Sequence, residues 1–170
     1  MSNFPRILLI DDDSFWLESL AEFLRRKGFA VLEARSADEA LALLEKEEVS
    51  LIISDYKLPG MDGLHLVRHL RHQQRRVAIV MLSSEDEPTL ADRAVSAGAH
   101  AFFPKAAAPS QLLRKIRQII SAALVKELTA PALHLWQRLL PNPNRSGYNN
   151  SKERSINSLL NGSSKKSRKP

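Results

Sequence analysis

Charged and hydroxyl side chains follow four of the short apolar runs in this sequence. Asp11 and Asp12 follow the first run, Asp55 follows the third, Ser83 follows the fourth, and Lys105 comes just after the fifth. A carboxylate at the end of a buried segment is costly unless a partner holds it there. The pattern therefore indicates that these side chains are kept for chemistry at one place.

The residue types point to phosphoryl chemistry on a carboxylate. Three carboxylates that are brought together repel one another unless a cation lies among them. Ligands that offer only oxygen atoms suit Mg²⁺, which completes its shell with water and phosphate oxygens. Lys105 and Ser83 are suited to bind the other oxygens of a phosphoryl group. Because Asp11 and Asp12 look like the metal shell, Asp55 is the expected nucleophile, which would form an acyl phosphate.

These residues need a scaffold that brings strand ends together. The predicted strands cover residues 6–10, 29–34, 49–54, 77–82 and 100–103, and the predicted helices follow them near 14–27, 36–44, 62–72, 88–97 and 110–124. Such alternation predicts an α/β fold, with a mostly parallel sheet covered by helices on both faces. Ligands bind such open sheets beyond the carboxyl ends of the strands, at a switch in strand order.

Local signals support several of these boundaries. Asp13 or Ser14 can cap the first helix, and Gly28 ends it. Residues 36–39, Ser-Ala-Asp-Glu, form a capping box for the second helix. Pro131 is expected to break or restart any continuation of the last helix.

Four spaced motifs resemble the CheY-like receiver domain of two-component response regulators. They are Ile-Asp-Asp-Asp at 10–13, Asp-Tyr-Lys-Leu-Pro-Gly-Met-Asp-Gly at 55–63, Leu-Ser-Ser at 82–84 and Gly-Ala-His-Ala-Phe-Phe-Pro-Lys at 98–105. The resemblance covers about residues 5–124. It implies a flavodoxin-like (βα)5 fold with an open parallel sheet of five strands in the order 2-1-3-4-5.

The resemblance also implies residue roles. Asp55 would be phosphorylated by the phosphohistidine of a sensor histidine kinase or a histidine phosphotransfer protein. Asp12 would bind Mg²⁺ directly, Asp11 mainly through water, and Asp55 and the backbone carbonyl of Lys57 would complete the protein ligands. Lys105 would contact the phosphoryl group. Such a domain assists its own phosphorylation and dephosphorylation and is a phosphoacceptor, not an enzyme in the usual sense.

Further positions correspond to the family's switch and gate. Ser83 is expected to move onto the phosphoryl group, so that Phe102 turns into the vacated space. Without the hydroxyl of the Tyr often found there, Phe102 is expected to prefer the buried rotamer. Lys57 and Glu85 stand where the family gates the water that hydrolyses the acyl phosphate, and we hypothesise that they pair and slow this attack.

The segment after Lys105 departs from the family pattern. Ala106 stands where a proline is common, often after a cis bond, and a cis bond before Ala costs about 3 kcal/mol. The backbone conformation at this point is therefore left open by the sequence. Residues 105–110, Lys-Ala-Ala-Ala-Pro-Ser, resemble receivers that precede a helix-turn-helix output domain, although residues 125–170 show no convincing helix-turn-helix.

Charge and composition separate the ends of the chain. Residues 1–124 hold 16 Lys or Arg and 17 Asp or Glu, whereas residues 125–170 hold 9 and 2, so the basic character belongs to the second part. There is no cysteine, which fits a reducing compartment. We find neither a signal peptide nor an apolar stretch that could cross a bilayer, and expect a cytoplasmic protein.

The last 46 residues leave three functions open. Residues 125–140 are predicted to be a helical extension and residues 141–170 a basic, disordered tail. The chain could act by binding a downstream protein, with residues 131–140 as a docking helix. It could instead regulate transcription by binding DNA through the tail, or be a phosphate sink in a phosphorelay. The resemblance also allows a homodimer through helices 88–97 and 110–124.

Two further groups have structural interpretations beside functional ones. His65, His69 and His72 fall on one helical stripe with a spacing that zinc can use, but a solvated face is the commoner meaning. Phe15 and Trp16 are interpreted as packing or partner-facing residues and not as a cofactor site.

Overall fold

The computed structural model describes residues 5–85 and 87–139, with the backbone only at residues 124 and 126–139. Strands and helices alternate along this part of the chain. The strands are β1 (Arg6–Ile10), β2 (Ala30–Ala34), β3 (Leu51–Asp55), β4 (Ala78–Ser83) and β5 (Ala101–Pro104). The helices are α1 (Ser14–Arg26), α2 (Ala37–Leu44), α3 (Gly63–His72), α4 (Leu90–Ala97) and α5 (Pro109–Leu139).

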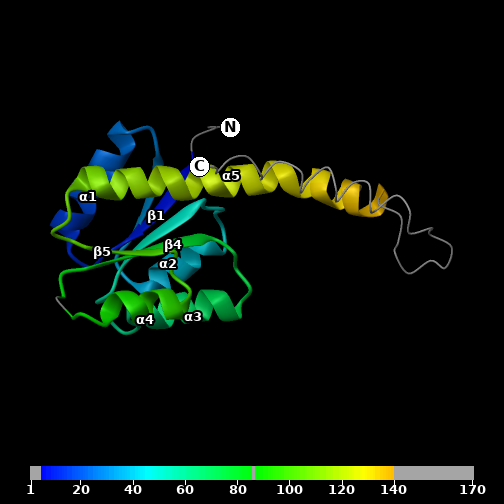
Figure 1. The fold of residues 1–170 in the computed structure, drawn as a ribbon. Helices are drawn as coiled ribbons and strands as arrows, with labels where there is room; N and C mark the ends of the chain where they lie inside the picture. Colours follow the sequence, from blue (N-terminus) through cyan, green and yellow to red (C-terminus); the bar gives the residue numbers. More distant parts are fainter. Residues whose placement is uncertain (1–4, 86, 140–170) are drawn as a thin grey trace, which may run out of the picture. The chain divides into compact units, whose positions relative to one another are not determined.

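The five strands form one parallel sheet in the order β2-β1-β3-β4-β5. Helices α1 and α5 cover one face, and α2, α3 and α4 cover the other (Figure 1). The predicted fold class and strand order are therefore confirmed. The strand order reverses between β1 and β3, so the edge where these two strands end is the expected ligand site.

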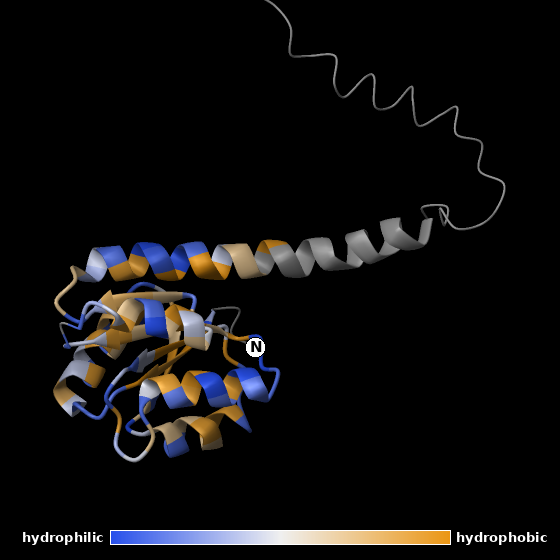
Figure 2. Cartoon of the chain, turned by 60° about the horizontal axis from the view of Figure 1, so that its bottom comes forward, coloured by the Kyte–Doolittle hydropathy of each residue, from blue (hydrophilic) through white to orange (hydrophobic). Residues whose placement is uncertain are grey.

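Alternate residues of each central strand face opposite helix layers. In β1, Leu8 and Ile10 pack with α2, α3 and α4, whereas Ile7 and Leu9 pack with α1 and α5. All four side chains are fully buried, which explains why β1 is an unbroken apolar run. Figure 2 shows the matching apolar faces of the helices turned toward the sheet.

Capping signals act where the sequence placed them. The Asp13 side chain accepts hydrogen bonds from the backbone of Phe15 and Trp16 at the start of α1. Ser36 Oγ accepts from Glu39 N–H at the start of α2, and Glu39 in return accepts from the backbone of Arg35. Asp13, not Ser14, is therefore the cap of α1.

Several predicted boundaries shift by one or two residues, and one prediction is wrong. Asp62 is the N-cap of α3, because its carboxylate accepts from His65 N–H. Helix α5 continues to Leu139 without a break at Pro131. An internal proline removes one backbone donor, which weakens a helix without necessarily ending it. No peptide bond in the described part of the chain is cis, so the bond from Lys105 to Ala106 is trans.

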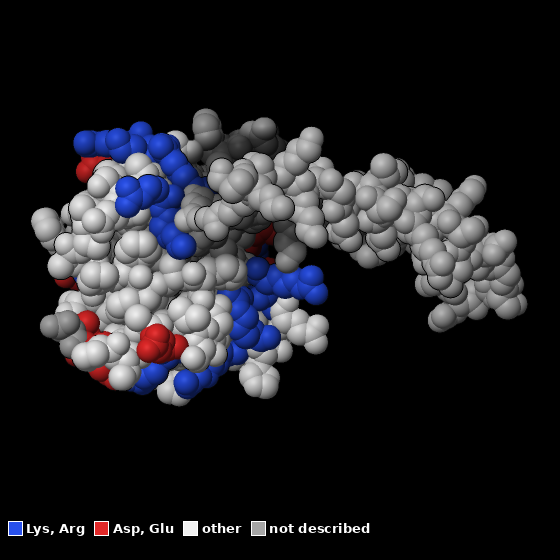
Figure 3. Space-filling view, in the orientation of Figure 1, with Lys and Arg blue, Asp and Glu red and all other residues white. Residues whose placement is uncertain are grey.

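The chain divides into two units after Lys126. The predicted boundary at residue 124 stays a prediction, and the predicted tail, residues 141–170, lies outside the described residues, as do the side chains of the predicted docking helix. Within the described part, none of the helices combines the length and apolar character that crossing a membrane requires. On the face drawn in Figure 3, Lys and Arg gather in two separate groups, over the first turns of α5 and near the end of α3.

Candidate functional site

Strand register brings the predicted residues to one edge of the sheet. Ile10 of β1 pairs with Ser54 of β3, so the next residues, Asp11 and Asp55, end up side by side. Asp55 in turn pairs with Leu82 of β4. One residue further, Ser83 pairs with Pro104 of β5, which places Lys105 beyond the same edge. Four strands thus contribute to one cluster because parallel strands end together.

Three carboxylates form the acidic part of this cluster. One carboxylate oxygen from each of Asp11, Asp12 and Asp55 lies within 4.8 Å of the other two. Asp11 is completely buried and Asp55 is 5% exposed, whereas Asp12 is open to solvent. Two of the three acids are therefore withdrawn from water, with one exposed acid at the entrance.

Lys105 is the cation that holds the buried pair. Its Nζ lies 2.6 Å from Asp11 Oδ2 and 3.0 Å from Asp55 Oδ2, and its side chain is only 14% exposed. The backbone N–H of Lys105 donates to the carbonyl of Ser83 at 2.7 Å, which fixes the loop that carries it. The lysine therefore bridges the ends of β1 and β3 from the end of β5.

Backbone groups orient the two buried carboxylates. Oδ1 of Asp11 accepts from the N–H of Asp13 at 3.0 Å, and Oδ1 of Asp55 accepts from the N–H of Tyr56 at 2.8 Å. One oxygen of each acid thus accepts a hydrogen bond from the loop that follows its strand. Its other oxygen, Oδ2, is turned toward Lys105 and the shared space.

The cluster carries more negative charge than its single ammonium balances. Burial raises the pKa of Asp11 and of Asp55, although Lys105 counteracts this shift. Burial alone would lower the pKa of Lys105, but its contacts with the two carboxylates outweigh burial and raise it. All three groups therefore hold protons more tightly than usual, the two acids chiefly because they are buried and the ammonium because of its acidic partners.

This donor set fits a hard divalent cation. Within the described residues, Asp11 Oδ2 is buried without a hydrogen-bond donor in good geometry, and Lys105 is its only ionic contact. All three acids offer oxygen, and the added charge would relieve their repulsion. Among the described side chains, this is the only group of three that could hold a metal. The stripe of His65, His69 and His72 does not form one, so the zinc alternative gains no support.

Ser83 and Phe102 lie on neighbouring strands beside the cluster. Ser83 is 1% exposed, and its Oγ accepts from the backbone N–H of Glu85 at 2.9 Å. Phe102 is half-buried and packs against the core beneath α3 and α4. Their roles as a switch stay a prediction, as does the ligand role of the Lys57 carbonyl.

Lys57 and Glu85 pair across the mouth of the site. Lys57 Nζ lies 2.6 Å from Glu85 Oε1, with side-chain exposures of 68% and 40%. The hydrogen bond to Glu85 raises the pKa of Lys57. The two loops that follow β3 and β4 are therefore tied together beside Asp55, as the gate hypothesis requires, while the gating role itself is untested.

Two residues near the site, Gly63 and Trp16, have contacts that the sequence did not predict. A Cβ on Gly63 would lie 2.3 Å from the backbone carbonyl oxygen of Asp55, so only glycine lets α3 begin this close to the end of β3. The ring of Trp16 lies 4.7 Å from Lys105 Nζ, measured to the ring centroid. The close approach of Gly63 follows from packing that no spacing rule reveals, although its place in the 55–63 motif is a signal.

The comparisons with known proteins agree with this geometry. Residues 7–117, well over half of the chain, match the family model described as the response regulator receiver domain. The chain belongs to this family. The resemblance seen in the four motifs is therefore confirmed at the level of the family and its fold.

Several curated relatives are 33% to 37% identical to this chain over the segments that align. A transcriptional activator protein, ExaE of Pseudomonas putida, is 35% identical over 146 residues, which are 84% of this chain and 66% of that protein. The two-component response regulator ORR11 of Oryza sativa subsp. indica is 34% identical over 119 residues, 68% of this chain and 81% of that protein. The chain spans 48% and 26% of two other curated relatives.

Solved receiver domains have the same fold. A CheY-like response regulator receiver domain protein from Methanospirillum hungatei is 31% identical, with a TM-score of 0.66 over 71% of this chain and 96% of that one. The chemotaxis response regulator CheY4 of Vibrio cholerae is 28% identical, with a TM-score of 0.64. These likenesses concern the receiver and leave open what this chain acts on.

Proposed function

We propose that Asp55 accepts a phosphoryl group from the phosphohistidine of a sensor histidine kinase or a histidine phosphotransfer protein. The observation that carries this proposal is the nearly buried Asp55 carboxylate, 3.0 Å from Lys105 and grouped with two further acids at the edge of the sheet. In the reaction an Asp55 oxygen bonds to phosphorus while the phosphorus–nitrogen bond breaks. The imidazole leaves with that electron pair and takes up a proton, and an acyl phosphate remains.

The surrounding residues have separate tasks in this proposal. Asp11, Asp12, Asp55 and the carbonyl of Lys57 would hold Mg²⁺, whose charge would lower the repulsion between the incoming phosphoryl oxygens and the carboxylates. The Lys105 ammonium binds one phosphoryl oxygen. The Ser83 hydroxyl leaves Glu85 N–H and donates to another phosphoryl oxygen. The chain is a phosphoacceptor, and it returns to its starting state only when the acyl phosphate on Asp55 is hydrolysed.

Phosphorylation by a small acyl phosphate tests the proposal without a known kinase. We expect wild-type protein with acetyl phosphate and Mg²⁺ to gain the mass of one phosphoryl group, and Asp55→Asn to gain none. Excess EDTA should abolish the gain. Asp62→Asn is the matched control, because Asp62 is not one of the three grouped acids and Asn can still cap α3, so uptake should stay intact. Equal labelling of Asp55→Asn and wild type would refute the proposal.

The acyl phosphate would act by changing what the chain binds. Movement of Ser83 empties space beside Phe102, so the ring turns further inward and the surface of α4, β5 and α5 changes. Capture of partners by wild type, Asp55→Ala and beryllofluoride-treated protein checks this model. A partner bound only by the beryllofluoride form supports a switch, whereas identical partner sets would indicate a phosphate sink.

The Lys57–Glu85 pair is proposed to set the lifetime of the acyl phosphate. The two residues follow Asp55 and Ser83 by two positions and are exposed, so we expect them to lie where water approaches the phosphorus atom. Lys57→Asn should shorten the half-life several-fold because the ammonium no longer shields the phosphoryl group. Lys46→Asn, at an exposed site beyond α2, should leave it unchanged. An unchanged half-life in Lys57→Asn would refute the proposal that the Lys57–Glu85 pair slows hydrolysis.

A transcriptional role is the second candidate. The name of ExaE and a match that extends over 84% of this chain favour it. A DNA contact through the basic residues 141–170 would be strongly salt-dependent and weakly sequence-selective. A duplex shift that weakens with salt and disappears when these residues are removed supports this candidate, and a shift that persists without them assigns DNA binding elsewhere. For either role we propose a cytoplasmic protein.

A further inference from the structure

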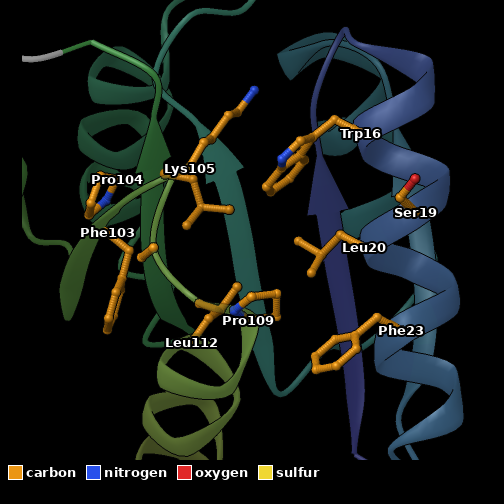
Figure 4. Close-up of a pocket in the computed structure, with 11 residues that line it drawn as sticks. Trp16, Ser19, Leu20, Phe23, Phe103, Pro104, Lys105, Pro109 and Leu112 are labelled. Carbon is orange, nitrogen blue, oxygen red and sulfur yellow. The ribbon is translucent and has the colours of Figure 1, made fainter.

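Trp16 stands against the ammonium that bridges the acids. It projects from the first turn of α1 toward Lys105, which comes from the loop after β5 (Figure 4). The Lys105 Nζ lies 4.7 Å from the ring centroid, within the range of a cation–π contact. The lysine therefore has three partners, of which two are carboxylates and one is neutral.

The indole is held in place independently of the lysine. The backbone N–H of Trp16 donates to Asp13 Oδ1 at 3.1 Å, and the N–H of Asp13 donates to Asp11 Oδ1 at 3.0 Å. Its ring packs on the core between α1 and α5. A hydrogen-bonded loop thus connects the Trp16 backbone to the first acid, and core packing limits where the ring can turn.

The surroundings of the contact strengthen it. Trp16 and Lys105 lie at the rim of a pocket of about 190 Å³ whose other walls are mostly apolar, among them Leu20, Phe23 and Leu112 (Figure 4). The Lys105 side chain is 14% exposed. Cation–π attraction grows as the cation loses water. A mostly buried ammonium facing an indole is therefore in the stronger part of that range.

The lysine must change partners during the proposed reaction. Asp11 Oδ2 and Asp55 Oδ2, which Lys105 contacts here, would also be needed to hold a divalent cation, and phosphorylation would occupy an oxygen of Asp55. The lysine stem is long and flexible, so a freed ammonium has many other positions open to it. Of the three partners of Lys105 among the described residues, only the indole would be lost neither to metal binding nor to phosphorylation.

We propose that Trp16 is a positioning residue, which keeps the Lys105 ammonium aimed at the phosphoryl position while its carboxylate partners are replaced. This inference rests on the proposed role of Asp55 and deepens it. It assigns no contact between Trp16 and the phosphoryl group. Removing the indole should slow phosphorylation of Asp55 about 5- to 10-fold, the rate equivalent of a partly desolvated cation–π contact.

The first experiment measures the rate of phosphorylation by acetyl phosphate at saturating Mg²⁺. Trp16→Leu should be about 5- to 10-fold slower than wild type, and Trp16→Phe should fall between them because benzene attracts cations less strongly than indole. Phe23→Leu is the matched control, since Phe23 lines the same pocket from the same helix but its ring lies 5.6 Å from the Nζ of Lys27 and makes no cation–π contact with Lys105. Its rate should equal that of wild type.

A double-mutant cycle separates positioning from general packing. In a Lys105→Met background the ammonium is absent, so Trp16→Leu should leave the residual rate unchanged. The same loss in both backgrounds would show that the indole acts through structure alone and would overturn the inference. Wild-type protein that is never labelled on Asp55 would overturn the proposed function as well, whereas labelled wild type with an unaffected Trp16→Leu overturns only the role of Trp16.

Fluorinated indoles supply a readout that packing does not move. Trp16 and Trp136 are the two tryptophans of the chain, so Trp136→Phe leaves Trp16 as the single site for mono-, di- and trifluorotryptophan. Each fluorine withdraws electron density from the ring face with little change of shape, which weakens the attraction for a cation. The logarithm of the rate should fall steadily with each fluorine. A flat series would overturn the proposal even if Trp16→Leu were slow.

Discussion

The two ends of the same parallel strands treat charge in opposite ways. At the amino edge, Arg71 donates from Nε and Nη2 to the carbonyl of Gly98, at 3.1 and 2.9 Å, and from Nη1 to that of Arg75 at 2.7 Å. Arg75 in turn donates to the carbonyl of Leu44 at 2.8 Å. These carbonyls lie at helix ends or in loops leading into β3, β4 and β5, where cations are favourable.

At the carboxyl edge the negative charge of the acids exceeds the positive charge beside them. Asp11 and Asp55 are buried, Asp12 is nearby, and Lys105 is the only ammonium that pairs with the buried acids among the described residues. One edge therefore uses cations to satisfy oxygen atoms, and the other gathers oxygen atoms in excess of its cation. The difference indicates that the amino edge serves stability, while the carboxyl edge gives up stability for a ligand.

The largest change in the free energy of unfolding is expected at the amino edge. Arg71→Met removes three hydrogen bonds to two carbonyls that lead into β4 and β5, and should lower the free energy of unfolding by about 2 kcal/mol. Arg68→Met, on an exposed position of the same helix, should change it by less than about 0.5 kcal/mol. Urea unfolding measures both. Equal losses in the two variants would mean that these carbonyl contacts do not hold the edge, and Asp55 labelling should remain in both.

Divalent metal should stabilise the carboxyl edge alone. At ten times its dissociation constant, Mg²⁺ should raise the free energy of unfolding by about 1.4 kcal/mol, because it binds the folded acids and not the unfolded chain. EDTA should reverse the gain. Asp12→Asn should need more Mg²⁺ for the same effect, whereas Arg71→Met should respond as wild type does. A gain of equal size and midpoint in Asp12→Asn would remove Asp12 from the metal site.

Much of this architecture followed from local patterns. The apolar run of β1, a cap at Asp13 or Ser14 and the residues 36–39 cap each depend on neighbours in the chain, so the sequence predicted them, and the structure decides for Asp13. The meeting of Asp11, Asp55 and Lys105 also followed, because the carboxyl ends of parallel strands share one edge. The family motifs then supplied the strand order, which alternation alone does not.

What the sequence did not predict depends on distances across the fold. The Trp16–Lys105 contact joins α1 to the end of β5, 89 positions apart in the chain, and no residue spacing encodes it. The closeness of Gly63 to the Asp55 carbonyl likewise depends on how tightly α3 packs on β3. The uninterrupted α5 shows the opposite limit, where the local rule for Pro131 predicted a break that the helix does not have.

A smaller change in the free energy of unfolding, opposite in sign to that of Arg71→Met, is expected from the buried acid Asp11. Without divalent metal, Asp11→Asn should raise the free energy of unfolding by about 1 kcal/mol, since it removes a buried charge while Lys105 keeps Asp55. Asp12→Asn, at an exposed site, should change it by less than about 0.5 kcal/mol. Saturating Mg²⁺ should reverse the order of Asp11→Asn and wild type. If Asp11→Asn were less stable than wild type without metal, the Asp11–Lys105 ion pair would outweigh the cost of burying the carboxylate. The carboxyl edge would then not give up stability, and the contrast with the amino edge would fail.

The smallest effect concerns pH at the amino edge. Partial burial and the charge of Arg71 lower the pKa of His100, whose Nδ1 accepts from the backbone N–H of Ile79 at 3.2 Å. Since the folded pKa lies below the unfolded one, this contribution to stability is complete above pH of about 6.5 and is lost as the pH falls through the folded pKa.

His100→Gln should therefore flatten the fall in unfolding free energy between about pH 7 and 5. His72→Gln, an exposed control at the end of α3, should keep the wild-type slope. Because part of His100 remains exposed to solvent, the change in slope should be slight. A slope equal to that of His72→Gln would show that the His100 ring titrates as it does in the unfolded chain.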